Sequence, residues 1–108
     1  MPNDRYQLVF MTASSVEEAR RIAKALVEEH LAACVNVVES CRSVYRWKGE
    51  IVEDNEAMMF AKTSRGKFDA LTMRVAELHS YEVPEIIAVD LESLSESYAG
   101  FLRDALGE

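Results

Sequence analysis

The chain has 108 residues, of which 49% are hydrophobic and 29% are charged, and this composition indicates one globular domain over residues 1–108. Its formal net charge of −7 disfavours nucleic acid and anionic membrane surfaces as partners, because both repel an acidic protein. No apolar run approaches the roughly 20 residues that a membrane-spanning helix needs.

The first part of the chain predicts a strand followed by a helix. Residues 6–12 are rich in apolar and β-favouring side chains, which is typical of a strand. Ser14 or Ser15 can cap the next helix, since Glu17 and Glu18 each stand three positions after a serine, as in a capping box. Apolar side chains then recur at helical spacing, so one face of this helix is expected to be buried.

The central part of the chain predicts a long hairpin. Residues 31–47 contain many β-branched and aromatic side chains, and residues 51–62 return as the next strand. Lys48-Gly49 forms the turn, because glycine can take a positive φ. The outgoing arm would be about 50 Å long if straight, whereas a domain of this size is about 35 Å across. The arm must therefore project, or bend at a bulge in the polar stretch 39–43.

The last part of the chain predicts a helix, a strand and a second, shorter helix. Residues 63–79 form the first of these helices, with Ser64 as its cap. Pro84 keeps the residue before it extended and marks the beginning or edge of the strand. Ser95 caps the final helix, and its predicted inner side chains are Tyr98, Leu102 and Ala105.

The order of the elements indicates an α+β fold. The first six elements match the ferredoxin-like βαββαβ sandwich, in which two helices cover one face of an antiparallel sheet. The chain adds a C-terminal helix and a long hairpin between the second and third strands.

The outer half of the hairpin carries more apolar surface than two strands bury. Its apolar side chains are Val44, Tyr45, Trp47, Ile51 and Val52, and an isolated hairpin is only marginally stable in water. A second copy of the chain would cover these side chains and pair the exposed strand edges. We therefore expect an oligomer. The alternative is a bent hairpin that folds back over its own helices.

The two cysteines are expected to be reduced. Cys34 and Cys41 are seven residues apart on one strand, about 23 Å, and a disulfide needs Cα atoms within about 7 Å. Reduced thiols favour the cytoplasm. The start of the chain also lacks the basic and apolar pattern of a signal peptide.

Four motifs resemble those of the CutA family of divalent-cation tolerance proteins. They are AACVN at 32–36, SVYRWKGEI at 43–51, KT at 62–63 and YEVPEII at 81–87, and the likeness extends over about residues 8–102. The resemblance implies a ferredoxin-like fold and a tight homotrimer in which long strands of neighbouring subunits pair. It also implies a cytoplasmic location in bacteria, an association with copper tolerance, and a trimer architecture similar to that of PII signalling proteins.

The resemblance also implies a candidate metal ligand, His79. Copper binding in the family is attributed to a cysteine at the end of the first strand and to a pair of histidines before the Tyr-Glu segment. Met11 stands at the cysteine position and Leu78 at the position of the first histidine. A thioether is a soft ligand that suits Cu(I), whereas leucine binds no metal. The alternative role for His79 is a favourable charge at the C-terminus of its helix.

The polar and aromatic members of the matching motifs form a second candidate site. They are Trp47, Lys62, Tyr81, Glu82 and Glu85. They would line a cleft between subunits, where the lysine and the paired carboxylates hold a small molecule. The alternative is that Trp47 packs across the interface and Lys62 pairs with a glutamate.

The sequence contains no phosphate-binding glycine-rich loop, G-x-S-x-G elbow or H-E-x-x-H helix, so we expect no enzymatic activity. The first functional hypothesis is a homotrimeric CutA-type protein that contributes to the response to divalent metal ions and binds copper, or another divalent cation, weakly. The second is a PII-like signalling module that binds a small molecule in the clefts between subunits.

Overall fold

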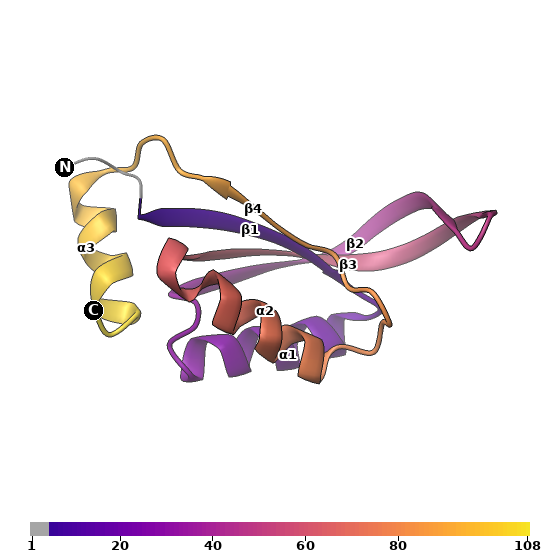
Figure 1. Cartoon of the computed structure of the whole chain (residues 1–108), viewed down its shortest axis with the longest axis horizontal. Helices are drawn as coiled ribbons and strands as arrows, with labels where there is room; N and C mark the ends of the chain where they lie inside the picture. The colour runs from indigo at the N-terminus through magenta and orange to yellow at the C-terminus, as the bar shows by residue number, and fades with distance from the viewer. Residues whose placement is uncertain (1–4) are drawn as a thin grey trace.

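The structure is a computed structural model that describes residues 5–108; residues 1–4, at the start of the segment inspected for a signal peptide, lie outside it. The described residues form a four-stranded antiparallel sheet, with strand order β2-β3-β1-β4, and three α-helices (Figure 1). The strands are β1 (Tyr6–Ala13), β2 (Cys34–Trp47), β3 (Glu50–Ser64) and β4 (Ile86–Asp90). The helices are α1 (Val16–Glu28), α2 (Phe68–Leu78) and α3 (Glu96–Ala105), and a 3-10 turn, η1 (Arg65–Lys67), precedes α2. The predicted ferredoxin-like arrangement with an added C-terminal helix is confirmed.

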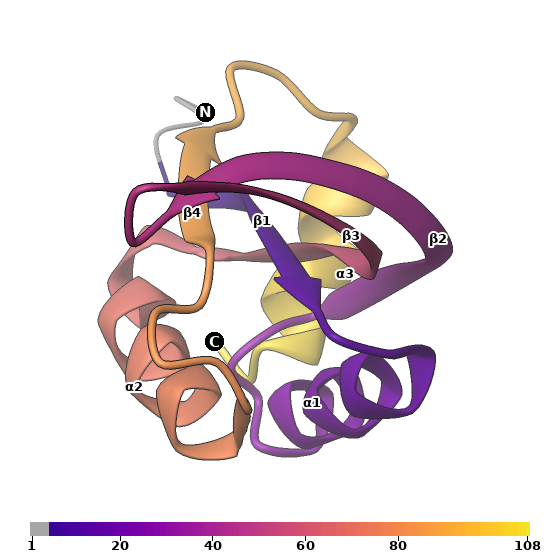
Figure 2. The ribbon, with the colours of Figure 1, turned by 90° about the vertical axis from the view of Figure 1, so that its right-hand side faces the viewer.

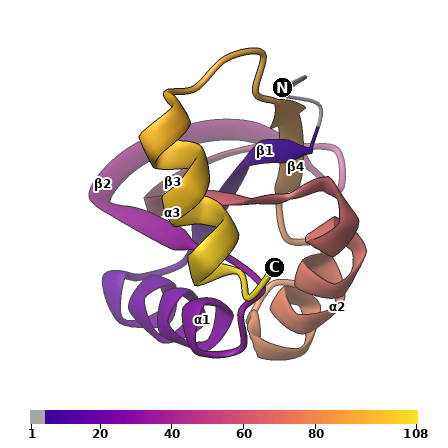
Figure 3. The same ribbon diagram turned by 90° about the vertical axis from the view of Figure 1, so that its left-hand side faces the viewer.

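Helices α1 and α2 cover one face of the sheet, and α3 lies at the end of the molecule opposite the hairpin (Figures 1 and 3). Alternate side chains of β1 and β3 face these helices, and three such pairs are buried in register: Val9 with Ala61, Met11 with Met59, and Ala13 with Ala57. The helices contribute the fully buried side chains Ile22, Leu26, Leu71 and Val75. This alternation places the main core between the sheet and the two helices.

The start of α1 is connected to a distant loop. Ser15 caps the helix as predicted, because its hydroxyl accepts a hydrogen bond from the N–H of Glu18 at 3.1 Å. Glu18 does not return this bond to the cap residue, as it would in a capping box. Its carboxylate instead accepts the N–H and O–H groups of Ser14, at 2.9 and 2.8 Å, and the N–H of Ser80 at 2.7 Å.

Two predicted roles for side chains in the helices are wrong. Ser64 does not cap α2, because it is the last residue of β3 and its hydroxyl donates to Glu108 at 2.9 Å. Tyr98 does not face inward: it is 36% exposed and its ring lies 5.4 Å from that of Phe101. Only one stripe of α3 reaches the small second core, in which Leu102 is fully buried.

The hairpin has the predicted turn, and it shows both alternatives given for its length, a bulge and a projecting outer half. Lys48 and Gly49 both have positive φ, 50° and 83°. The register shifts between Val38 and Cys41, so that two residues of β2 stand opposite one residue of β3. Beyond the bulge the hairpin projects from the sheet and its tip turns toward the side of β4, rather than folding back over the helices (Figures 1 and 2).

The sheet face opposite α1 and α2 is largely apolar, although Asn36, Glu56 and Lys62 also lie on it. Among the described helices only α3 packs against it, at the end that carries Tyr6. The apolar side chains of the remainder, the uncovered sheet face, come from all four strands: Leu8, Phe10, Val38, Met58, Phe60, Ile87 and Val89. The rings of Phe10 and Phe60 pack edge to face at 5.4 Å. Ile87 and Val89 remain 55% and 48% exposed. An apolar surface that extends across all four strands of a sheet is typical of an interface.

Cys34 and Cys41 are both free, which confirms that they do not bridge each other. Among the described helices, none has the length and apolar character required to cross a membrane.

Candidate functional site

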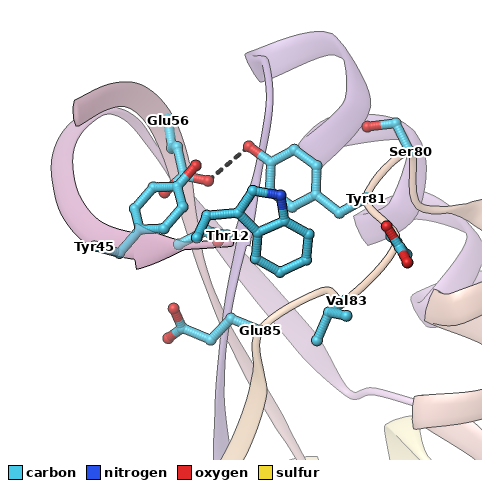
Figure 4. A pocket seen from close by; sticks show the side chains of 9 residues that line it. Thr12, Tyr45, Glu56, Ser80, Tyr81, Val83 and Glu85 are labelled. Atoms are coloured by element: carbon cyan, nitrogen blue, oxygen red, sulfur yellow. Dashed lines mark hydrogen bonds between the residues drawn. The ribbon is translucent and has the colours of Figure 1, made fainter. Parts of the chain in front are cut away.

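A pocket of about 490 Å³ lies between the bent hairpin and the loop that joins α2 to β4 (Figure 4). Strand β1 contributes Thr12, and the hairpin contributes Tyr45, Trp47 and Glu56. The loop contributes Ser80, Tyr81, Glu82, Val83 and Glu85. The volume is within the range of small-molecule sites.

The pocket brings together four of the five residues predicted for the second site, namely Trp47, Tyr81, Glu82 and Glu85. The structure places Lys62 elsewhere. It is six residues from Glu56 along β3, about 20 Å, on the uncovered sheet face. Its Nζ contacts the side-chain oxygen of Asn36 and lies 3.8 Å from the Sγ of Cys34, so its neighbours are not carboxylates.

Two tyrosines of the pocket donate to carboxylates. The Tyr81 hydroxyl donates to Glu56 Oε2 at 2.7 Å, and Glu56 is only 5% exposed. Burial and this hydrogen bond raise the pKa of Tyr81. The Tyr45 hydroxyl donates to Asp54 Oδ2 at 2.5 Å, and this bond, together with burial, raises the pKa of Tyr45 to about 12. Both phenols are therefore neutral, with their protons directed at carboxylates.

His79 fixes the loop that forms one wall of the pocket. Its Nε2 donates to the carbonyl oxygen of Thr12 at 2.7 Å, and its Nδ1 accepts from the N–H of Tyr81 at 3.0 Å. These two partners assign a neutral ring with the proton on Nε2. The imidazole is buried and its centroid lies 4.7 Å from that of the Tyr81 ring. This arrangement differs from the positive charge at a helix C-terminus that the alternative for His79 requires.

The surroundings of His79 do not form a preformed metal site. Met11 is a fully buried core residue, and Leu78 packs against the same core. Within residues 5–108, no group of three or more His, Cys, Asp or Glu side chains is placed to hold a metal ion. A metal ion at His79 would have to replace one of the two hydrogen bonds of the ring.

Reasoning from the sequence missed five residues that line the pocket. The position of one of them, Glu56, in the sequence could have identified it. Glu56 is the one carboxylate in the apolar run EAMMFA, on the side of the strand that Met58 and Phe60 share. A buried carboxylate needs a hydrogen-bonding partner, which points to a polar site. The other four are Thr12, Tyr45, Ser80 and Val83. The bend of the hairpin and the path of the loop bring them together, and no local pattern determines either.

Comparison with known proteins gives a consistent assignment. The family model described as "CutA1 divalent ion tolerance protein" matches residues 7–105. The divalent-cation tolerance protein CutA of Thermus thermophilus is 48% identical over 101 residues, covering 94% of this chain and 98% of that protein. The chloroplastic protein CutA of Arabidopsis thaliana is 36% identical over 98 residues, covering 91% of this chain and 54% of that protein. The solved structure of CutA from Synechococcus elongatus PCC7942 has a TM-score of 0.92 at 34% identity, covering 98% of this chain and 94% of that one.

The chain spans about half the length of several animal and plant relatives. These matches carry the CutA description and do not favour the PII-like alternative. Because the family model and the similar proteins cover almost the whole chain, and the folds agree, the chain belongs to the CutA1 divalent ion tolerance protein family.

Proposed function

We propose that this chain acts as a divalent-cation tolerance protein without enzymatic activity, and that it works as a homotrimer in the cytoplasm. The observation that carries the proposal is the 48% identity to the Thermus thermophilus divalent-cation tolerance protein over 94% of the chain. A similarity of this extent includes the sheet, the helices and the loop that forms the pocket. The two free cysteines support a reducing compartment.

The exposed apolar surfaces support the homotrimer. The uncovered sheet face is one such surface. The side of the outer hairpin that faces away from Tyr45 and Trp47 is another, with Val44 and Ile51 each 64% exposed. Strands β2 and β4 also present free edges, because they end the sheet on either side. These surfaces are what neighbouring copies would cover, and the number three is the one that the resemblance to CutA proteins implies.

Copper, or another divalent cation, is the proposed ligand, and His79 is its proposed binding residue. The net charge of −7 favours the accumulation of cations near the surface. The hydrogen bonds of His79 to Thr12 and Tyr81 compete with a metal ion, so binding costs one buried hydrogen bond. This competition supports weak binding rather than a permanent metal centre.

A copper titration tests this role. Copper(II) should raise the melting temperature of the protein in a concentration-dependent way, because a ligand that binds only the folded state stabilises it. The shift should be lost in His79→Ala and kept in His30→Ala, which removes the other of the two histidines. Equilibrium dialysis of copper against the folded variants gives a second readout. Wild-type protein without a copper-dependent shift, or an equal shift in His79→Ala, would rule out the metal role of His79.

A further inference from the structure

The charged side chains that line the pocket between the hairpin and the loop are all negative. Three of its lining residues are glutamates, Glu56, Glu82 and Glu85, and none of the described lining residues is basic. Three others are aromatic: Tyr45, Trp47 and Tyr81. Figure 4 shows Glu56 and Glu85 entering from different segments, with the rings of Tyr45 and Tyr81 close to Glu56. Aromatic rings combined with carboxylates favour an organic cation and disfavour an anion.

The chain itself places an ammonium group at the rim of this pocket. The Nζ of Lys48 lies 5.6 Å from the centroid of the Trp47 ring and 3.9 Å from a carboxylate oxygen of Glu82. Both partners line the pocket, so the rim already accommodates this kind of cation. The Lys48 and Glu82 side chains are 72% and 73% exposed, and such a surface contact is easily exchanged for another.

The inner end of the pocket keeps its negative character. Glu56 is buried and receives the Tyr81 hydroxyl, and the nearby Asp54 receives the Tyr45 hydroxyl. Because the pKa of each phenol is raised, both rings stay neutral at physiological pH. The pocket therefore offers uncharged aromatic walls beside carboxylates, with no cation of its own at the inner end among the described lining residues.

We propose that this pocket binds an organic ammonium ion, with the cationic head against the three aromatic side chains and between the carboxylates of Glu56 and Glu85. Lys48 acts as an internal competitor at the rim. A volume of about 490 Å³ leaves room for an organic amine and is far larger than a bare metal ion needs. His79 supports the loop through Tyr81 but does not line the pocket, so the ammonium ion and a metal ion at His79 would use different binding groups.

Fluorescence of Trp47 can follow binding directly, because the chain has a single tryptophan and it lines the pocket. Purified protein in its native assembly should show a saturable fluorescence change with n-butylammonium chloride at constant ionic strength. Neutral 1-butanol and anionic butyrate, which have the same carbon chain length, should give no saturable change. Magnesium chloride should also give none.

Three variants and one control locate the site. Glu56→Gln should raise the dissociation constant for butylammonium about tenfold, and Glu53→Gln, an exposed position on the same strand outside the pocket, should leave it unchanged. Glu85→Gln, at an exposed loop position that tolerates substitution, should raise it about threefold. Lys48→Asn should lower it about threefold, because it removes the competing ammonium, and asparagine tolerates the positive φ of this turn position.

Several results would overturn the inference. They are an unsaturable response to butylammonium, an equal response to 1-butanol, or an affinity that neither Glu56→Gln nor Glu85→Gln changes. A saturable response to magnesium in place of the amine would also overturn it. None of these outcomes bears on the copper titration at His79, so the two proposals fail separately.

Discussion

At the scale of single residues, Glu18 joins the start of α1 to the loop that carries His79 and Tyr81. Its carboxylate is 4% exposed and accepts hydrogen bonds from Ser14 and from the N–H of Ser80. Burial raises the pKa of Glu18, but the hydrogen bonds from Ser14 and Ser80 outweigh burial and lower the pKa from 4.5 to about 2. The charged form is therefore the one that holds the pocket wall in place.

The low pKa of Glu18 predicts a specific loss of stability in acid. The contribution of the carboxylate is fully present above pH 4.5 and disappears as the pH falls toward 2, because the folded state binds the proton less tightly than the unfolded state. Glu18→Gln should lower the free energy of unfolding at pH 7 by about 2 kcal/mol and should flatten its decline below pH 4.5.

Urea denaturation at pH 7, 4.5 and 3 measures both effects. Glu17→Gln, at the exposed neighbouring position, should change the free energy of unfolding by only a few tenths of a kcal/mol. The same acid slope in wild type and Glu18→Gln would contradict the assignment.

The identities of several site residues were predictable, but their contacts were not. Trp47, Tyr81, Glu82 and Glu85 lie in motifs that the sequence displays, and the pocket contains all four. The separation of Lys62 from them follows from its distance along β3, which a list of motif residues ignores. The hydrogen bonds of His79 depend on the path of the loop and were likewise not visible in the sequence.

At the scale of elements, local features were predicted correctly and those that depend on distant partners were not. The turn at Lys48-Gly49 and the bulge after Val38 depend on nearby residue types, and both are present. The predicted cap of α2 was wrong, because the hydroxyl of Ser64 donates to Glu108, 44 residues further along the chain. No pattern around Ser64 indicates that partner.

The hairpin turn gives a prediction about backbone conformation. Gly49 has φ +83°, and a Cβ added there meets no atom within 4 Å. Gly49→Ala should therefore lower the free energy of unfolding by about 1 kcal/mol through the strained φ alone. Gly66→Ala is the matched control, because that position also has open space and its φ is not positive. Chemical denaturation of both variants checks this, and equal effects would contradict the φ argument.

At the scale of the whole molecule, apolar surface remains after the core is complete. The length of the hairpin predicted a partner, and the uncovered sheet face adds a second reason for one. The apolar character of this face could have been predicted from the sequence. The central strands contain successive apolar residues, such as VFM in β1 and AMMFA in β3. Runs of this kind indicate strands that are covered on both faces.

A single charge on the uncovered face should separate the subunits. Ile87 is 55% exposed in the single chain, so Ile87→Glu should disturb folding little but place a charge in the proposed interface. Light scattering coupled to gel filtration should give the mass of three chains for wild type and of one chain for Ile87→Glu.

Val27→Glu should keep the wild-type mass, because Val27 is 41% exposed on α1, away from this sheet face. A wild-type protein with the mass of one chain, or an Ile87→Glu protein that keeps the mass of three, would refute the homotrimer.

The extra residue in β2 at 39–40 also restricts how the hairpin can change in length during evolution. Side chains alternate between the two sides of a strand, so one additional residue reverses the side of every position that follows. Tyr45 and Trp47 thereby share a side with Glu56, while Val44 and Arg46 point away. Deleting one of the two residues would exchange these sets without altering the strand order. Homologues of this chain should therefore gain or lose residues in this arm in even numbers, although the arm is exposed and other exposed segments tolerate any change in length.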